Sequence, residues 1–232
     1  LALAAGPVSL LADIVEQLVR AQILRVDLTL RVGHDLRGQP EAGGTCRNGR
    51  WSEAARNMAP VTVRLRIDPD HIDPSAITGA ADVLRSGGLV AFPTETVYGL
   101  GAAIDRPDAL RRIFEVKGRP PTDPLIVHLA DPGDLAAGAL ELAAGALDGA
   151  ASDDRTGGLV AEVAPAAMAL ADAFWPGPLT IVVRRGRRID DVISAGGPSV
   201  GLRVPAHPVA AGLIRAAGCP LAAPSANRFG RI

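Results

Sequence analysis

The stretch of residues 87–119 constrains the fold more than any other part of the chain. It opens with an apolar segment of strand length at 88–92, and a polar Pro-Thr-Glu-Thr turn follows at 93–96. A loop with Gly99 and Gly101 comes next, and then a segment with helical periodicity that ends in Lys-Gly-Arg. Ligands of open α/β sheets bind where strands end. We therefore expect this stretch to frame a site for an anionic ligand.

From residue 61 onward, strand and helix patterns follow one another regularly. Asp73 and Pro74 suit the N-cap and first position of a helix, and Gly87 stands where that helix would end. The patterns predict strands at 61–67, 89–92, 124–129, 179–183, 200–204 and 221–223, and helices at 74–86, 107–117, 165–174 and 208–217. A helix and then a mobile loop are expected within residues 133–160. Alternating strands and helices favour an open α/β sheet.

Residues 1–57 do not continue this regular pattern. Residues 9–24 resemble an amphipathic helix, 26–32 alternate like a strand, and 33–57 are polar and rich in Gly and Arg without a period. The change of pattern near Met58 indicates an N-terminal appendage of unknown structure, residues 1–57. We expect it to pack weakly on a single domain at residues 61–232, or to be disordered.

Composition excludes several classes of protein. The chain is 48% hydrophobic and 21% charged with a formal net charge of −1, so no overall field would recruit nucleic acid or an anionic membrane. No apolar run reaches the roughly 20 residues of a spanning helix. Cys46 and Cys219 have neither metal-ligand spacing nor a disulfide framework, which suits a reducing, cytoplasmic location.

Lys117 is the one lysine among 24 basic residues, and Arg119 follows it two positions later. In an extended segment, residues i and i+2 point the same way, so both cations could converge on one phosphate group. The alternative is that they balance the dipole of a helix C-terminus, and spacing alone favours this alternative. Arginine does not replace lysine where a compact ammonium is needed, which makes the lone lysine informative.

Other polar candidates follow predicted strands. His128 lies on an apolar strand, where a histidine is more often a core residue than a ligand, and Arg203 lies near a strand end. Ser225 and Asn227 follow the last predicted strand and could reach a ligand or form a local turn. The sequence has no Walker or dinucleotide-binding motif, no zinc spacing and no Ser-His-Asp pattern.

Five segments together resemble the YrdC family of threonylcarbamoyl-AMP synthases. They are GGLVAFPTETVYGLG at 87–101, KGRPPTDPLIVHLAD at 117–131, FWPGPLTIVV at 174–183, VGLRVPAHP at 200–208 and PLAAPSAN at 220–227. They occur in the family's order and cover most of residues 61–232. The resemblance implies a YrdC-like fold, which is a twisted open mixed sheet with flanking helices around a basic cavity. It also implies that the end of the domain lies beyond Ile232.

The implied reaction joins L-threonine, bicarbonate and ATP into L-threonylcarbamoyl-AMP and pyrophosphate. A separate tRNA threonylcarbamoyl-transferase complex would then use the product to modify adenosine next to the anticodon. Mg²⁺ is expected with ATP, held mostly by phosphates and water rather than by protein ligands. A weak RNA contact through a basic turn predicted at residues 184–188 is a further expectation, and no membrane partner is expected.

The resemblance also implies the roles of individual residues. The family's K-x-R and S-x-N motifs give Lys117 and Arg119 as catalytic, phosphate-binding cations. The threonine contacts fall on Thr96, His128, Arg203 (as a bidentate partner of the carboxylate) and the backbone at Ala223. The ATP contacts fall on Lys117, Arg119, Asp123, Ser199, Ser225 and Asn227. Asp123 stands where many relatives have Asn, and its carboxylate would repel a triphosphate.

Two alternatives remain open at the level of the sequence. A carbamoyl-adenylate-forming domain of the hydrogenase-maturation type shares this fold, but residues 1–57 show no zinc-finger or acylphosphatase-like segment. An RNA-binding module would use the basic cavity directly. Aromatic residues make up only 3% of the chain, so few side chains are available to stack on bases.

Overall fold

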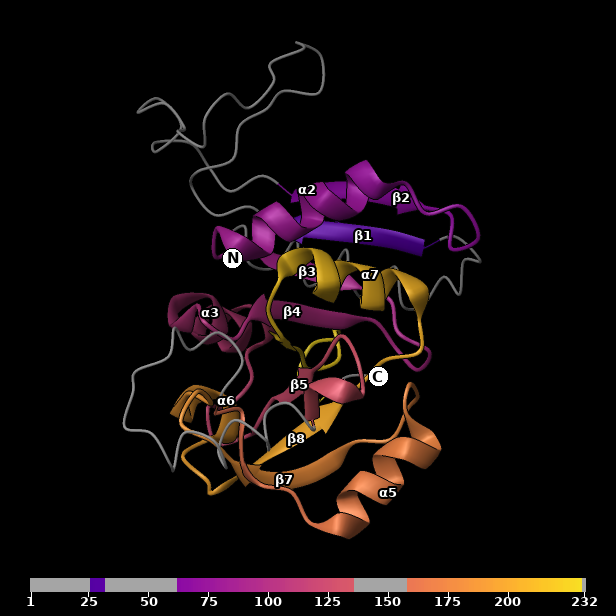
Figure 1. Ribbon diagram of the computed structural model, residues 1–232. Helices are drawn as coiled ribbons and strands as arrows, with labels where there is room; N and C mark the ends of the chain where they lie inside the picture. Colours follow the sequence, from indigo (N-terminus) through magenta and orange to yellow (C-terminus); the bar gives the residue numbers. More distant parts are fainter. Residues whose placement is uncertain (1–25, 32–61, 136–157, 231–232) are drawn as a thin grey trace, which may run out of the picture.

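The computed structural model describes residues 26–31, 62–135 and 158–230, and these form one nine-stranded sheet with helices on both faces (Figure 1). The strands are β1 Val26–Arg31, β2 Thr62–Ile67, β3 Leu89–Phe92, β4 Gly99–Ala103, β5 Ile126–His128, β6 Val160–Glu162, β7 Ile181–Arg185, β8 Ser199–Arg203 and β9 Leu221–Ala222. The helices are α2 Pro74–Arg85, α3 Pro107–Lys117, α5 Pro165–Phe174, α6 Asp191–Ser194 and α7 Pro208–Ala217.

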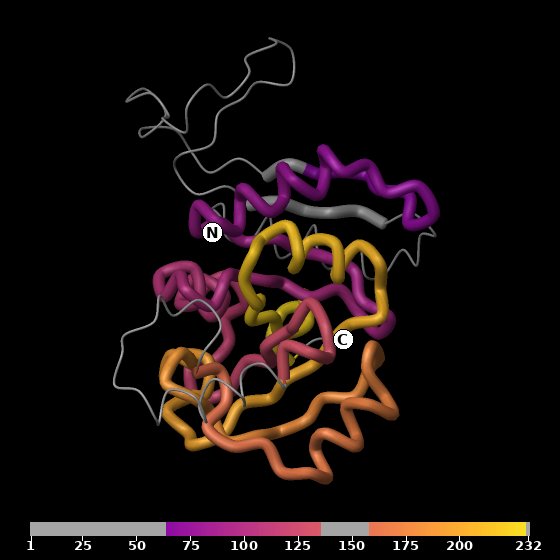
Figure 2. The backbone as a smooth tube through the Cα atoms, viewed as in Figure 1, coloured from indigo at the N-terminus to yellow at the C-terminus, as the bar shows by residue number. Residues whose placement is uncertain are grey.

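The strand order is β2-β1-β3-β4-β9-β5-β8-β7-β6, and the sheet is mixed. Strands β5 and β8 pair in parallel, while every other described pair is antiparallel. The tube in Figure 2 shows that the segment of β2, in purple, and the segments of β6 and β7, in orange, lie at opposite ends of the molecule. The predicted fold class, a twisted open mixed α/β sheet with flanking helices, is confirmed.

Both faces of the central strands are buried, because alternate side chains enter two separate cores. In β3, Val90 and Phe92 pack with α2 and α7 on one face, whereas Leu89 and Ala91 face the opposite core with α3. Strand β9 divides in the same way, with Leu221 in the first core and Ala222 in the second. A strand covered on both faces is a near-continuous apolar run, as the sequence of β3 is.

Local signals in the sequence explain where the helices begin and end. The Asp73 carboxylate accepts a hydrogen bond from the backbone N–H of Ser75, and Pro74 is the first residue of α2. Helix α3 ends at Gly118, whose φ of 60° lies in the left-handed region that favours glycine. The predicted helices at α2, α3, α5 and α7 are confirmed.

Strand β4 corrects one prediction, because the segment with Gly99 and Gly101 was expected to be a loop. The two glycines are paired with β3, opposite Phe92 and Val90 respectively. A Cβ atom on Gly101 would lie 2.6 Å from Cε1 of Phe92, so only glycine fits beneath that ring. These glycines therefore serve close packing within a strand rather than a turn.

Strand β1 changes the predicted domain boundary. Its residues belong to the expected appendage, yet the structure places β1 inside the sheet, between β2 and β3. The backbone of each neighbour provides hydrogen-bonding groups that a strand of matching length can satisfy. The rest of residues 1–57 lies outside the described residues, as does most of the helix and loop predicted within 133–160.

Short elements were the hardest to foresee. The sequence did not predict β6 or α6, and β7 includes Arg184 and Arg185, which were expected in a basic turn. Within the described residues, no helix is long and apolar enough to cross a membrane.

Candidate functional site

A cavity of about 280 Å³ lies where β5, β8, the β3–β4 turn and the segment after β9 converge. Four of the residues that line it were predicted to contact threonine, and two more were predicted to contact ATP. The lining residues are Thr94, Thr96, Val97, Tyr98, Gly99, Arg119, Pro124, Ile126, His128, Arg203, Ala223, Pro224 and Ser225. The topology thus brings together side chains that are more than 100 positions apart in the sequence.

Arg203 is a buried cation at the end of β8 and at the wall of the cavity. Its Nε donates to the carbonyl oxygen of Gly177 at 3.2 Å. Its Nη2 donates to Oγ1 of Thr96 at 3.1 Å and to Oε1 of Glu95 at 2.8 Å. Among the described residues, Nη1 is the guanidinium nitrogen without a hydrogen-bond partner, so it remains for a ligand.

The Thr96 hydroxyl faces the cavity as a hydrogen-bond acceptor. Thr94 Oγ1 donates its one hydrogen to the carbonyl oxygen of Val97, so it does not donate to Thr96 Oγ1, which lies 3.0 Å away. Thr96 Oγ1 accepts from Arg203. A lone pair remains, and it can accept a hydrogen bond from an N–H or O–H group of a ligand.

Glu95 is the residue of this site that the sequence reasoning missed. The Pro-Thr-Glu-Thr turn was singled out, but nothing in the sequence pairs Glu95 with a residue 108 positions away. Burial alone would raise the pKa of the Glu95 carboxyl, but the hydrogen bond and charge of Arg203 outweigh it and hold the pKa below its usual range. Glu95 is therefore ionised and forms an ion pair with Arg203.

His128 lines the cavity as a neutral side chain. It is 4% exposed, and its ring meets that of Phe92 edge-on, with centroids 5.9 Å apart. Burial, and then the positive charge of Arg203, lower its pKa to about 4. Its Nδ1 atom has no hydrogen-bond partner within the described part of the chain. A buried polar atom is rarely left unpaired, so Nδ1 is a candidate ligand contact.

Arg119 also lines the cavity and is paired with Asp123. The ion pair is 3.0 Å long, and Nη2 also donates to the carbonyl oxygen of Pro124 at 2.8 Å. The guanidinium carbon lies 5.8 Å from the centroid of the Phe229 ring. Asp123 therefore offsets part of the Arg119 charge that an anionic ligand would meet.

Lys117 is 5% exposed and does not line the cavity. Its Nζ donates to the carbonyl oxygen of Ser225 at 2.6 Å and also to that of Asn227. Burial, followed by the nearby charge of Arg119, lowers its pKa to about 8. Lys117 thus holds the segment after β9, whose Ser225 does line the cavity. Its predicted role at the phosphates stays a prediction.

Ser199 and Asn227, like Lys117 and Asp123, are predicted ATP contacts that do not line the cavity. Ser199 opens β8, so it stands four residues from Arg203 at the opposite end of that strand. Asn227 contributes its carbonyl oxygen to Lys117, and its side-chain amide donates to the carbonyl oxygen of Arg228. Both assignments stay predictions.

The wall of the cavity carries two cations, Arg203 and Arg119, each paired with a carboxylate. The neutral imidazole of His128 lies near Arg203. Such a site suits a ligand that carries both a carboxylate and phosphate groups, because charge-assisted donors favour these anions. No group of three or more His, Cys, Asp or Glu side chains in the described ranges could hold a metal ion.

Known proteins resemble this chain across the same region. The family model Sua5_yciO_yrdC, described as "Telomere recombination", matches residues 82–232. Threonylcarbamoyl-AMP synthase of Pyrococcus abyssi is 41% identical over 162 residues, which are 70% of this chain and 42% of that protein. The Bacillus subtilis protein of the same name is 42% identical over 160 residues, 68% of this chain and 40% of its own length. The chain thus spans about two fifths of these relatives.

A shorter relative and two solved structures are also similar to most of this chain. Threonylcarbamoyl-AMP synthase of Halorhodospira halophila is 36% identical, and the match covers 70% of this chain and 74% of that protein. The crystal structure of Pyrococcus abyssi Sua5 complexed with L-threonine is similar at a TM-score of 0.59 and 42% identity, over 69% of this chain and 41% of that one. Escherichia coli YciO, at 23% identity and a TM-score of 0.54, matches over 68% of this chain and 66% of its own and shares the fold.

Proposed function

Because the chain belongs to the Sua5/YciO/YrdC family, we propose that it forms L-threonylcarbamoyl-AMP and pyrophosphate from L-threonine, bicarbonate and ATP. The observation that supports this most is the cavity. Its wall combines Arg203, Thr96 and His128, which suit a small polar amino acid, with Arg119, which suits phosphate. A relative of 42% identity is known in complex with L-threonine.

The reaction needs positioning and charge more than covalent help from the protein. The amine of threonine and bicarbonate give a carbamate and water. A carbamate oxygen then attacks the α-phosphorus of ATP, and the bond to the β-phosphate oxygen breaks to release pyrophosphate. The chain must hold the carbamate in line with that bond and stabilise the charge that moves onto pyrophosphate.

Threonine would lie against the β5–β8 side of the cavity. Arg203 Nη1 would donate to its carboxylate, and the lone pair of Thr96 Oγ1 would accept from its hydroxyl or amine. The unpaired Nδ1 of His128 would contact the same ligand, and the backbone at Ala223 would close that side. The neutral state of His128 avoids a third positive charge beside Arg203.

The phosphates would lie toward Arg119 and Ser225, near the segment that Lys117 holds. An ammonium has three donors and Lys117 uses two on backbone carbonyls, so one remains that could reach a phosphate oxygen. Asp123, Ser199 and Asn227 are also proposed to contact ATP, although none of the three lines the cavity. Mg²⁺ would enter with ATP and be held mostly by phosphate oxygens and water.

The product would leave for a tRNA threonylcarbamoyl-transferase complex, and the enzyme would act in the cytoplasm together with this complex and its substrates. The basic residues near Arg184 could supply a weak RNA contact, as predicted from the sequence. These partners follow from the proposed reaction.

The test is pyrophosphate release by the purified chain. Release should require L-threonine and bicarbonate together, and it should fall to background when either is omitted or when bicarbonate is removed by degassing. Mass spectrometry should find threonylcarbamoyl-AMP in the complete reaction. Release of pyrophosphate or phosphate from ATP without threonine would contradict the proposal. Retention of RNA on a filter without ATP would instead favour an RNA-binding module.

A further inference from the structure

Glu95 connects three separate parts of the chain behind the cavity wall. It lies in the turn between β3 and β4, and its Oε1 accepts from Arg203 at the end of β8 at 2.8 Å. Its Oε2 accepts from the backbone N–H of Ala206, between β8 and α7, at 3.2 Å. Both carboxylate oxygens are therefore used by partners far away in the sequence. Such a contact fixes the turn and Arg203 relative to each other.

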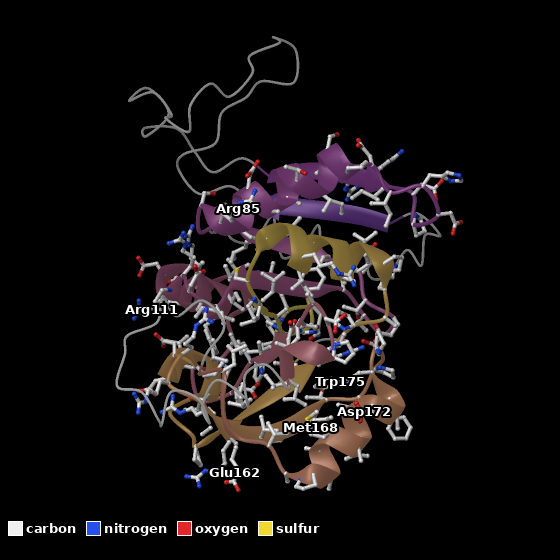
Figure 3. The ribbon with its side chains drawn as sticks, viewed as in Figure 1. Arg85, Arg111, Glu162, Met168, Asp172 and Trp175 are labelled. Carbon is white, nitrogen blue, oxygen red and sulfur yellow. The ribbon has the colours of Figure 1, made fainter. Side chains whose placement is uncertain are left out.

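Glu95 supports the cavity without lining it. The lining includes Thr94 and Thr96 on either side but omits Glu95, whose side chain is 21% exposed. Arg203 has a further contact, because its Nε donates to the carbonyl oxygen of Gly177. Gly177 lies two residues after Trp175, which Figure 3 labels at the end of α5. Nε and Nη2 are thereby committed to the protein. This leaves Nη1 to meet a ligand.

We propose that Glu95 is a positioning residue for the threonine carboxylate, an inference that rests on the proposed function. By holding Nη2 of Arg203, Glu95 directs Nη1 into the cavity, and Arg203 binds the carboxylate end-on through this one nitrogen. This differs from the bidentate contact that the sequence predicts for Arg203, because the second donor of the fork is already occupied. The Thr96 hydroxyl, which shares Nη2 with Glu95, is set in place by the same pair.

Removal of Glu95 should affect threonine binding in two opposing ways, so the direction of the change in affinity decides between them. Glu95 is an anion, so its removal should also reduce repulsion and draw a carboxylate more strongly to Arg203. Positioning should outweigh this effect, because the Arg203 side chain is only 10% exposed and would lose the partner that fixes its orientation. A displacement of about 1 Å in such a group costs up to roughly a hundredfold in rate. Loss of Glu95 should weaken threonine binding if Glu95 positions Arg203, and should tighten it if Glu95 only repels the threonine carboxylate.

The experiment measures L-threonine binding by calorimetry, and KM for threonine and for ATP, in Glu95→Ala and Glu95→Gln. Glu95→Ala should raise the threonine Kd and KM at least tenfold and leave the KM for ATP within about twofold. Glu95→Gln keeps an oxygen that can accept from Arg203 and should fall between Glu95→Ala and wild type. It also keeps the test valid if Glu95→Ala fails to fold.

Two comparisons isolate the route through Arg203. In an Arg203→Ala background, Glu95→Ala should cause little further loss of threonine affinity, because the two residues act as a unit. Asp108→Asn is the control: it breaks a 2.9 Å ion pair with Arg111, which lies at the periphery of the molecule in Figure 3. It should leave threonine binding unchanged.

The outcomes separate this inference from the proposed function. If wild type binds L-threonine and Glu95→Ala binds it equally or more tightly, the positioning role is overturned and the proposed function stands. Additive losses in the double variant would likewise overturn it. If wild type does not bind L-threonine, the proposed function fails and this inference fails with it.

Discussion

Lys117 shows how the surroundings of one side chain can add a role that the sequence alone did not suggest. The sequence left two roles open, at a phosphate or at a helix end. The structure adds a third role, because the buried ammonium donates to the carbonyl oxygens of Ser225 and Asn227. Any role at the phosphates would therefore be combined with holding the segment that lines the cavity.

Replacement of Lys117 by alanine should lower both stability and activity. It would leave two carbonyl groups without their donor, at about 1–3 kcal/mol for each group that stays unsatisfied, whereas a helix-end role alone predicts about 0.3–1 kcal/mol. Pyrophosphate release should fall by orders of magnitude. Lys117→Arg should restore neither stability nor activity to the wild-type level, because a planar guanidinium cannot replace a compact ammonium. Melting curves and turnover of both variants check this, and near-wild-type turnover in Lys117→Ala would remove Lys117 from the site.

His128 should make the folded state sensitive to acid. Its folded pKa of about 4 lies below the ordinary value of 6.5, so between these values the unfolded chain binds more protons than the folded one. The contribution of His128 to stability is fully present above pH 6.5 and is lost as the pH falls toward 4. Its size is on the order of 3 kcal/mol. Chemical unfolding at pH 7 and pH 4.5 should show a smaller pH-dependent loss in His128→Gln than in wild type. Equal losses would contradict the assignment.

At the scale of single elements, the predictions succeeded where the signal was local. The helices α2, α3, α5 and α7 each begin with proline, and three of them end at or just before a glycine, so neighbouring residues settle their ends. Strand β4 was missed because its glycines read as a loop. Glycine is needed at these positions because the Phe92 ring lies against them on the neighbouring strand. No local sequence pattern reveals such a contact across a sheet.

Gly101 therefore offers a test at the level of one strand pair. Gly101→Ala should destabilise the fold by about 1–3 kcal/mol, because its Cβ would overlap the Phe92 ring. Gly79→Ala is the matched control, since that glycine lies in α2 with nothing within 4 Å of the added Cβ. Its effect should be neutral or stabilising by about 0.4–1 kcal/mol.

Denaturant unfolding of the two alanine variants measures the difference directly. In a Phe92→Leu background, Gly101→Ala should cost less than in the wild type, because the ring that blocks the methyl group is gone. An equal cost in both backgrounds would show that the Phe92 contact is not what requires glycine at this position.

At the scale of the whole molecule, the residues of the cavity could be named from the sequence but their connections could not. Thr96, His128, Arg203 and Ala223 line one cavity, as the resemblance implied. The sequence did not indicate that Glu95 holds Arg203, because the pair depends on how β3 and β8 lie across the sheet. It also gave no sign that Asp123 pairs with Arg119, since turn geometry decides that contact.

The segment after β9 should stabilise the fold and complete the cavity. Pro224 accepts from the N–H of Leu100 at 2.9 Å, and Ala226 donates to Tyr98 at 2.7 Å, in addition to the two contacts with Lys117. A chain ending at Ala223 loses these bonds, each worth about 0.5–1.5 kcal/mol. Its melting temperature should fall by roughly 10 °C, and threonine should no longer raise it. A chain ending at Gly230 keeps these bonds and serves as the control. Equal melting of the two chains would contradict this account.

Strand β9 also has a consequence for the order in which the protein can be made. It consists of residues 221–222, yet it lies in the middle of the sheet, between β4 and β5. During synthesis on the ribosome, β4 and β5 emerge well before β9, which comes last among the described strands. Until then β4 and β5 present open edges on which a neighbouring nascent chain can add a strand. Closure of the sheet is therefore a late, long-range step; such contacts form slowly, and unpaired strand edges are prone to aggregation until they form.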